Sequence, residues 1–529
     1  MKELYLTDKG LTDAGWREAG YELPAFDRAR MKAETDKAPR WVHFGAGNIF
    51  RAFIARSAQT LLNDGKTTTG IIAAEGYDPE ILERCYRPFD DLSILVTLCG
   101  DGSTEKTVIG SIARSLTLTD EALSAAFASP SLQMASFTIT EKGYAVRGAD
   151  GAFLPRVAAD IEAGPDKAAG YLGRVTALLY HRFKAGGAPL AMVSMDNCSG
   201  NGDKLRAAVT AHADGWVKNG AVPAAFCGWL SDKVSFPRTM IDKITPRPDP
   251  TVEKMLRQDG VQNMAPVVTE KKSFIAPFVN AEECEYLVLE NDFPNGRPPL
   301  EAAGWIFTDR ATVDKTERMK VCTCLNPLHT ALAVFGCLLG YTLISEEMKD
   351  EDLAALVKKL GYEEGLPVVT DPGVLDPKEF IDTVIGKRLP NPFLPDSPQR
   401  IATDTSQKLA IRFGETIRAY GENAGTLSAL PLALAGWLRY LLAVDDEGRP
   451  FTPSSDPRLD EVSRALSGFK LGDAPSDAAL RAALSPLFKD ETLFGVDLTA
   501  VGLADKVTAA FKAMITAPGA VRKTLQAAI

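Results

Sequence analysis

The sequence lacks the paired cysteines, basic runs and long apolar stretches that mark several common classes of protein. Its eight cysteines are scattered without a CxxC unit, so we expect reduced core residues rather than a disulfide framework. No dense Lys/Arg run is present and the formal net charge is -10, which argues against a nucleic-acid partner. No window approaches about eighteen uninterrupted apolar residues, and the first residues form no apolar signal core. These absences favour a cytoplasmic protein without a membrane partner.

The composition that remains is that of an ordinary globular protein, with 45% hydrophobic and 24% charged residues. A chain of 529 residues is too long for one compact core, so two domains are expected. We predict an N-terminal arm over residues 1–40, an α/β domain over 41–290 and a mainly α-helical domain over 291–529. The boundary is set at the Pro/Gly-rich run NDFPNGRPP, residues 291–299. No internal repeat is found.

A strand, a glycine turn and a helix follow one another near the start of the α/β domain. The run Trp41–Phe44 is typical of a buried strand, and an amphipathic stretch leads from the glycines to about Leu62. Gly45 permits the tight turn, and Gly47 lets the backbone approach a pyrophosphate at the helix N-terminus. The pattern predicts a Rossmann-type dinucleotide site. The third glycine of GxGxxG is replaced by Phe50, so a plain strand-to-helix turn remains an alternative.

Further apolar runs predict an open α/β sheet, in which ligands gather beyond the carboxyl ends of the strands. Glu75 ends one strand, where its carboxylate would accept ribose hydroxyls and repel a 2′-phosphate, favouring NAD over NADP. The alternative interpretation of Glu75 is a solvent-exposed carboxylate at the end of a strand. The remaining strands are expected at residues 93–98, 107–109, 134–140, 190–195 and 286–289. The expected cofactor-binding residues are Gly45, Gly47, Asn48, Ile49, Glu75 and Glu141.

Beyond these strands the pattern becomes helical. The segment Phe236–Pro248 is interpreted as an ordered loop closing over the α/β domain. Helices are expected at residues 353–360, 380–385, 401–420, 427–442, 460–466, 477–483 and 503–514. Arg400, Lys408 and Arg412 form a cationic segment that could hold an anionic or polyhydroxylated ligand. A solvated helix face is the commoner origin of such a charge pattern.

The stretch KVCTCLNPLHTALAVFGCLLGY, from Lys320, places three polar side chains ahead of a long apolar helix. Asn326 and His329 are three residues apart and can share a helix face. Burial can lower the pKa of a lysine from about 10.4 toward about 7–8, the range of a useful general base. Lys320, Asn326 and His329 are therefore candidate catalytic residues. Packing and capping are the structural alternative.

Eight stretches, in order along the chain, resemble the polyol-specific long-chain dehydrogenases, the mannitol dehydrogenase family. They are HFGAGNIFRAF, VIGSI, TITEKGY, SMDNCSGNGD, FPRTMIDKITP, LENDFPNGRPP, LNPLHTALA and RIATDTSQKL. The resemblance implies a metal-independent, NAD(P)-dependent secondary-alcohol dehydrogenase with a Rossmann-type N-terminal domain and a mainly α-helical C-terminal domain, and Glu75 favours NAD. It also implies that the active site lies between the two domains.

The same resemblance implies roles for individual residues. Lys320 would be the general acid/base, and Asn326 and His329 would bind the reacting oxygen. The substrate-binding residues would be Asn197, Asp242, Arg400 and Lys408, to which the charge pattern adds Arg412. Glu141 would aid proton exchange with solvent. For the substrate, the cation-rich segment and the Ser-Gln-Lys-Leu motif favour D-fructuronate and D-mannonate. Mannitol with fructose and tagaturonate with altronate are alternatives, and a non-catalytic NAD-binding regulator is an alternative of another class.

One departure from the family pattern affects the proposed base. The family reads Asn-Gly-Ser-His where this chain has Asn326-Pro327-Leu328-His329, and its lysine lies five residues before the asparagine rather than six. One extra residue would rotate Lys320 by about 100° on a straight helix. A kink or π-bulge can absorb such an insertion. We therefore expect a helix irregularity that returns Lys320 to the site.

Overall fold

The computed structural model describes residues 3–529, which form two compact units. The first comprises residues up to 99 and 103–313, and the second comprises 100–102 and 314–529. The division thus lies after Val313, later than the boundary set at 290, because strand β15 (Ile306–Thr308) pairs with β14 (Tyr286–Glu290) of the first unit. The residues before 41 belong to the same unit, since β1 (Tyr21–Glu22) pairs with β5 (Thr104–Ile109).

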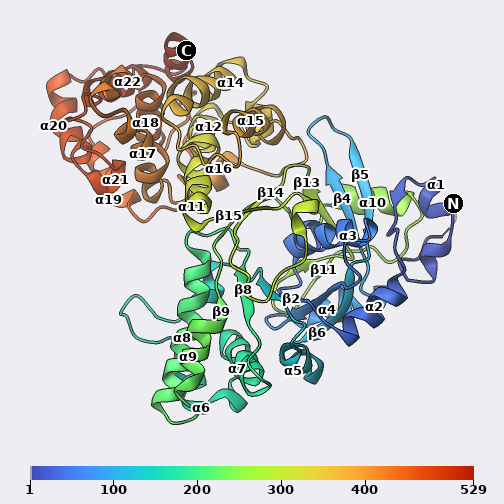
Figure 1. Ribbon diagram of the computed structural model, residues 1–529. Helices are drawn as coiled ribbons and strands as arrows, with labels where there is room; N and C mark the ends of the chain where they lie inside the picture. Colours follow the sequence, from blue (N-terminus) through green and yellow to red (C-terminus); the bar gives the residue numbers. More distant parts are fainter. Residues whose placement is uncertain (1–2) are drawn as a thin grey trace. The chain divides into compact units, whose positions relative to one another are not determined.

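The first unit is built on a six-stranded parallel sheet with the order β6-β3-β2-β7-β8-β9 (Figure 1). This is the strand order of a Rossmann fold, whose ligand site lies where the order reverses, here between β2 and β7. The Rossmann-type fold class is therefore confirmed. The strands are β2 (Trp41–Phe44), β3 (Ile71–Glu75), β6 (Ile112–Thr117), β7 (Met134–Phe137), β8 (Leu190–Ser194) and β9 (Val234–Ser235).

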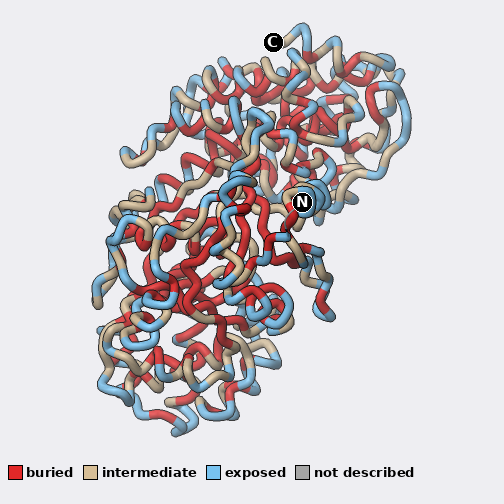
Figure 2. The backbone as a smooth tube through the Cα atoms, turned by 90° about the vertical axis from the view of Figure 1, so that its right-hand side faces the viewer, coloured by how far each residue is buried: buried red, intermediate tan, exposed pale blue. Residues whose placement is uncertain are grey.

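The two faces of this sheet are both covered, because alternate side chains enter different cores. Val42 and Phe44 pack in a core with residues of α5, α7, α8 and α9. Trp41 packs in a second core with residues of α3, α4 and the smaller sheets. Figure 2 shows the buried segments of the chain in red. The helices are α3 (Ala55–Asn63), α4 (Glu80–Cys85), α5 (Glu121–Ala128), α7 (Tyr171–Lys184), α8 (Asn201–Lys218) and α9 (Ala225–Lys233).

Two expectations about this unit were wrong. Strand β4 (Ser93–Leu98) pairs antiparallel with β5 and parallel with β13 (Phe278–Glu282). The strands β4 and β5, expected in the main sheet, therefore lie in a separate four-stranded sheet. The segment 236–248 is not only a loop, because β10 (Thr239–Asp242) is buried and pairs antiparallel with β14. A short hairpin of β11 (Val267–Val268) and β12 (Phe274–Ile275) follows α10 (Pro250–Gln258).

The second unit is helical, as predicted. Its longer elements are α12 (Asn326–Leu339), α14 (Glu351–Lys358), α15 (Pro377–Thr383), α18 (Ala429–Tyr440), α19 (Leu459–Leu466), α20 (Asp477–Phe488), α22 (Ala504–Met514) and α23 (Ala520–Ala528). The expected single helix over 401–420 is wrong, because this stretch is divided into several short helical pieces. They are α16 (Pro398–Ile401), a 3-10 turn (Thr405–Gln407), a π segment (Ala410–Gly414) and α17 (Glu415–Tyr420).

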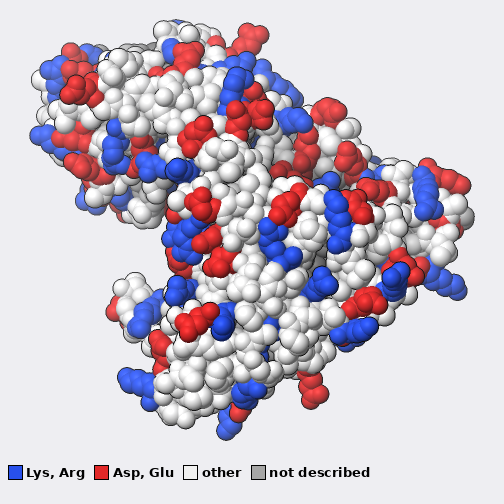
Figure 3. All heavy atoms as spheres, in the orientation of Figure 1, with Lys and Arg blue, Asp and Glu red and all other residues white. Residues whose placement is uncertain are grey.

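One continuous helical stretch, Arg310–Leu339, is long and apolar enough to cross a membrane by composition alone. Of its most apolar window, 83% is buried within the fold, as in the core helix of a globular domain. Lys and Arg side chains lie among Asp and Glu side chains on the face drawn in Figure 3, without a broad patch of either sign.

Candidate functional site

The turn after β2 has the geometry of a dinucleotide-binding loop. Gly45 has φ +108°, and a Cβ there would lie 2.3 Å from the carbonyl oxygen of Thr138, so only glycine fits. At Gly47 a Cβ would meet no atom within 4 Å, so this backbone faces open space. The helix begins at Asn48 and continues through a π segment, Phe50–Ile54, into α3.

Glu75 is less available to a ribose than its place at the end of β3 indicates. It is buried, and its Oε2 accepts a hydrogen bond from the Ala46 amide at 2.9 Å. Its Oε1 accepts from the amides of Tyr77 and Asp78 at 2.7 and 3.0 Å. The carboxylate therefore fixes the glycine turn against the end of β3, in addition to any contact with a ligand.

A cavity of about 310 Å³ lies beyond the carboxyl ends of β7, β8 and β10. Three predicted residues, Ile49, Glu141 and Asn197, line it, together with Thr140, Met195, Asp196, Ile241, Lys243 and Thr245. Glu141 Oε1 accepts an ion-pair contact from Lys204 at 2.6 Å. The predicted Asp242 ends the neighbouring strand β10 and is buried. The first unit thus brings Ile49, Glu141 and Asn197 together at one cavity, with Asp242 next to it in the chain.

The cavity wall includes a strained residue that no sequence signal indicated. Thr140 has φ +65° and ψ 156°, a region used almost only by glycine, which costs of order 1–3 kcal/mol. Asp196 holds it there, since its carboxylate accepts the amides of Ile139 and Thr140, each at 2.9 Å. Tyr144 also donates to this carboxylate, at 2.5 Å. Burial raises the pKa of Asp196, and these hydrogen bonds oppose the shift.

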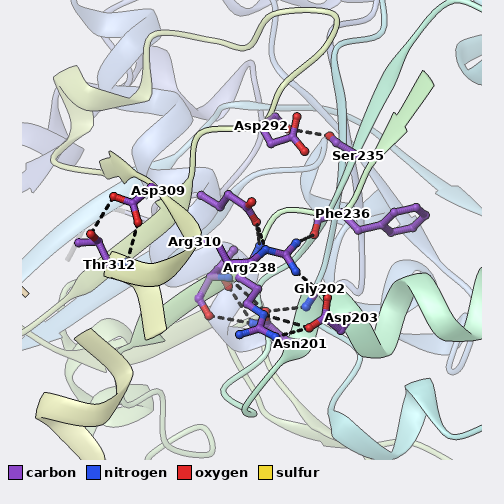
Figure 4. Close-up of polar contacts among 12 residues, drawn as sticks. Asn201, Gly202, Asp203, Ser235, Phe236, Arg238, Asp292, Asp309, Arg310 and Thr312 are labelled. Atoms are coloured by element: carbon purple, nitrogen blue, oxygen red, sulfur yellow. Dashed lines mark hydrogen bonds and ion pairs between the residues drawn. The ribbon is translucent and has the colours of Figure 1, made fainter. Parts of the chain in front are cut away.

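Ionic contacts anchor the first turn of α11 (Arg310–Met319), the helix that leads to Lys320 (Figure 4). Arg310 contacts Asp203 at 2.8 Å and Glu290 at 2.9 Å. Arg238, just before β10, also pairs with Asp203. These two arginines hold the pKa of Asp203 below its usual range, against the effect of its burial. The start of the helix is thereby fixed to α8 and β14.

Lys320 occupies the irregular turn expected from its spacing. Residues Lys320–Cys324 form a π segment between α11 and α12, closed by a hydrogen bond from the Leu325 amide to the Lys320 carbonyl at 3.1 Å. The hydroxyl of Thr416 donates to the Cys322 carbonyl at 3.0 Å and satisfies a group that the wide turn frees. Lys320 itself is buried, with 2% of its surface exposed. The expected irregularity is confirmed.

Asn326 and His329 lie in the first turns of α12 and are both half-buried. Nε2 of His329 lies 3.5 Å from Oδ2 of Asp396. Burial lowers the pKa of His329 to about 4; Asp396 opposes this shift, and the guanidinium groups of Arg412, Arg400 and Arg388 add to it. The imidazole is therefore neutral near pH 7 and can accept or donate one hydrogen bond.

The predicted cations gather around this histidine. Arg400 pairs with Asp396, and Arg412 donates from Nη1 to the Thr330 hydroxyl at 2.7 Å. Burial lowers the pKa of Arg412 to about 10, so it remains charged at pH 7. Lys408 donates to the carbonyls of Ile401 and Thr403, and burial lowers its pKa. The second unit thus groups Arg400, Lys408 and Arg412 near His329.

The residues that sequence reasoning missed are Thr140, Lys243, Asp396, Arg388 and the fully buried Arg51. Thr140, Lys243 and Arg51 lie within stretches that resemble the family, but no local pattern distinguished them there. Among the described residues no cluster of three or more His, Cys, Asp or Glu side chains is arranged to hold a metal ion. A dinucleotide fits the first unit, because the open backbone at Gly47 adjoins both the helix start and the cavity.

Comparison with known proteins identifies the family. The mannitol dehydrogenase Rossmann domain matches residues 39–302, and the mannitol dehydrogenase C-terminal domain matches residues 312–515. The chain is 49% identical over 524 residues to a D-mannonate oxidoreductase of Thermotoga maritima, covering 97% of this chain and 96% of that protein. It is 30% identical over 501 residues to the D-mannonate oxidoreductase of Escherichia coli, covering 92% and 94%.

Solved structures agree with this assignment. A D-sorbitol dehydrogenase in substrate-free form matches with a TM-score of 0.78 at 26% identity, covering 97% of this chain and 98% of that one. Pseudomonas fluorescens mannitol 2-dehydrogenase, in a ternary complex with NAD and D-mannitol, matches with a TM-score of 0.69 at 28% identity, covering 99% of both chains. This chain belongs to the mannitol dehydrogenase family and is an oxidoreductase whose cofactor is NAD.

Proposed function

We propose that this enzyme interconverts D-fructuronate and D-mannonate, with Lys320 as the general acid/base. The observation that carries the proposal is the group of arginines around His329, because a sugar acid differs from a polyol by a carboxylate. The identity with two D-mannonate oxidoreductases supports the same substrate pair. We also keep a cytoplasmic location as a prediction.

In the direction of oxidation, neutral Lys320 removes the proton from a secondary hydroxyl through Nζ. Bound NAD supplies the hydride acceptor, C4 of the nicotinamide. In the direction of reduction, the Lys320 ammonium returns a proton to the carbonyl oxygen. Burial of Lys320 supports this role, since water competes poorly for a proton exchanged in a closed site. The proposal requires both groups of site residues to reach one substrate molecule.

Asn326 and His329 are proposed to hold the reacting oxygen. The amide of Asn326 makes no side-chain hydrogen bond within residues 3–529, so its donors are available to a ligand. His329 is neutral near pH 7 and can donate one hydrogen bond to an oxyanion. Loss of one such preorganised donor typically lowers the rate by about 100- to 1000-fold.

The other predicted residues are assigned to the sugar chain. Asn197 and Asp242 would bind hydroxyl groups beside the cavity of the first unit. Arg400, Lys408 and Arg412 would bind hydroxyls and the carboxylate, with the planar guanidinium of Arg412 able to form a bidentate contact. Glu141, exposed at the cavity rim, would exchange protons with solvent.

A comparison of substrates tests the proposal. NADH oxidation is measured with D-fructuronate, D-tagaturonate and D-fructose at matched concentrations, and the largest kcat/KM is expected with fructuronate. A larger value with fructose would assign the enzyme to mannitol, and one with tagaturonate would assign it to altronate. NADH binding without turnover of any of the three would support the regulator alternative.

The role of Lys320 is tested separately. Lys320→Ala should abolish turnover in both directions while leaving NADH affinity unchanged. Lys315→Ala, an exposed lysine on the same α11 helix, is the matched control and should retain full activity. Turnover by Lys320→Ala within about tenfold of the wild type would refute the assignment, because general acid–base catalysis contributes about 100- to 10,000-fold.

A further inference from the structure

A fully buried arginine lies directly beneath the dinucleotide turn. Arg51 is 0% exposed and sits one turn into the helix that begins at Asn48. No carboxylate lies within ion-pair distance of it among residues 3–529, and its Nε has no hydrogen-bond partner there. A buried guanidinium without a counter-charge is costly unless something else supplies the negative charge.

Two contacts of Arg51 lead to the turn, whereas Nη1 is held elsewhere, in part by the Ser93 hydroxyl, which accepts at 3.3 Å. Nη1 donates to the Ala276 carbonyl at 2.7 Å, and Nη2 donates to Oδ1 of Asn48 at 3.0 Å. The guanidinium lies 5.6 Å from the ring of Tyr86, whose hydroxyl donates to the Ala46 carbonyl at 2.8 Å. The contact with Asn48 and the contact through Tyr86 both lead to residues between Gly45 and Asn48, where a dinucleotide diphosphate is expected.

A second arginine stands beside the same turn. Asn48 donates from Nδ2 to the Pro246 carbonyl at 3.2 Å, and the next residue, Arg247, is exposed. Its backbone is fixed by Asn280, which donates to the Arg247 carbonyl at 3.2 Å. Its guanidinium lies 4.4 Å from the Phe274 ring of the β11–β12 hairpin. An anchored backbone with an exposed cation suits contact with a mobile anion.

We propose that Arg51 and Arg247, joined through Asn48, form the cationic holder of the cofactor diphosphate. Arg247 contacts the phosphate oxygens directly. Arg51 is a positioning residue, which orients Asn48 and supplies positive potential from below the turn. The two phosphate charges of the dinucleotide then provide the counter-charge that Arg51 lacks within the protein. This inference rests on the cofactor and is independent of the sugar substrate.

Equilibrium binding to the full-length enzyme without sugar tests the proposal. The dissociation constants of NADH and of ADP-ribose, which carries the diphosphate without nicotinamide, are measured beside that of adenosine, which carries no phosphate. Arg247→Met should lower the affinity for NADH and for ADP-ribose by roughly ten- to a hundredfold and leave the affinity for adenosine unchanged. It should also reduce the salt dependence of NADH binding. The matched control is Arg257→Met, an arginine 68% exposed on nearby α10, which should change none of these values.

Arg51 is tested with three variants because its side chain is buried. Arg51→Met should weaken NADH and ADP-ribose by roughly tenfold or more, and Arg51→Lys, which keeps the charge, should restore part of the affinity. Asn48 is half-buried and contacts Arg51, so Asn48→Ala should lower the affinity for both ligands, and this test holds even if Arg51→Met does not fold. NADH affinity equal to the wild type in Arg247→Met or in Asn48→Ala would overturn the proposal. An equal loss for adenosine would also overturn it, since that loss would reflect a collapsed domain.

Discussion

Replacement of Arg412 by methionine tests whether the second unit recognises a carboxylate. Arg412 remains charged at pH 7, because burial lowers its pKa only to about 10. Thr330 accepts one of its hydrogen bonds at 2.7 Å and leaves the other N–H groups of the fork for a ligand. A charge-assisted hydrogen bond to a carboxylate contributes about 1.5–3 kcal/mol. We therefore expect KM for fructuronate to rise by roughly 10- to 150-fold.

The assay is NADH oxidation by Arg412→Met with fructuronate and with fructose, which lacks the carboxylate. KM for fructose should change less than about threefold, and kcat with fructuronate should change little, because the contact is remote from the reacting carbon. Arg412→Lys should recover only part of the loss, since an ammonium cannot bind a carboxylate bidentately. Arg418→Met, at an arginine 54% exposed on α17, serves as the control. Equal losses with both ketoses would refute carboxylate recognition by Arg412.

Three further predictions concern ionisation and strain. In NMR of labelled histidine, His329 should titrate near pH 4 rather than near pH 6.5. Arg412→Met should raise this pKa, because it removes a nearby positive charge. A titration midpoint above pH 6 in the wild type would contradict the site geometry. Glu347 is fully buried, its two carboxylate oxygens have no hydrogen-bond partner among residues 3–529, and burial raises its pKa to about 9. It binds a proton in the folded state that the unfolded state releases above about pH 4.5, so stability should fall as pH rises from about 5 to 9. The loss in the free energy of unfolding reaches about 3 kcal/mol at pH 7, since each pH unit above about 4.5 costs about 1.4 kcal/mol. Glu347→Gln should remove this dependence of the melting temperature on pH. Thr140→Gly should raise the free energy of unfolding by about 1 kcal/mol, because glycine adopts the positive φ without strain. The substitution should also raise the substrate KM, because the cavity wall is then less fixed. An unchanged melting temperature and KM would show that the strain is inconsequential.

Much of this architecture could be predicted because its signals are local. The strand, glycine turn and helix from Trp41 onward, and the helical periodicity of the second unit, are encoded over short windows. Lys320 and Asn326 were predicted with their irregular connection, since one extra residue on a straight helix would rotate Lys320 by about 100° relative to Asn326.

Other features depend on distant residues and carry no local signal. The strand at Thr239–Asp242 forms because β14 offers a partner about 45 residues away, whereas two flanking prolines favoured a loop. Likewise, β4 and β5 read as ordinary strands, and only their antiparallel pairing places them outside the main sheet. The burial of Arg51 and the positive φ of Thr140 follow from packing and from Asp196, which sequence periodicity does not reveal.

The wide turn at Lys320–Cys324 stores one surplus residue without disturbing the helix on either side. Removal of one residue within it, such as Thr323, would convert the turn to ordinary α-helix and keep the azimuth of Lys320 relative to Asn326 nearly constant. The register of the proposed base, Lys320, would then survive a deletion in the middle of the core. A turn of this kind lets the chain gain or lose one residue during evolution without moving the side chain proposed as the base.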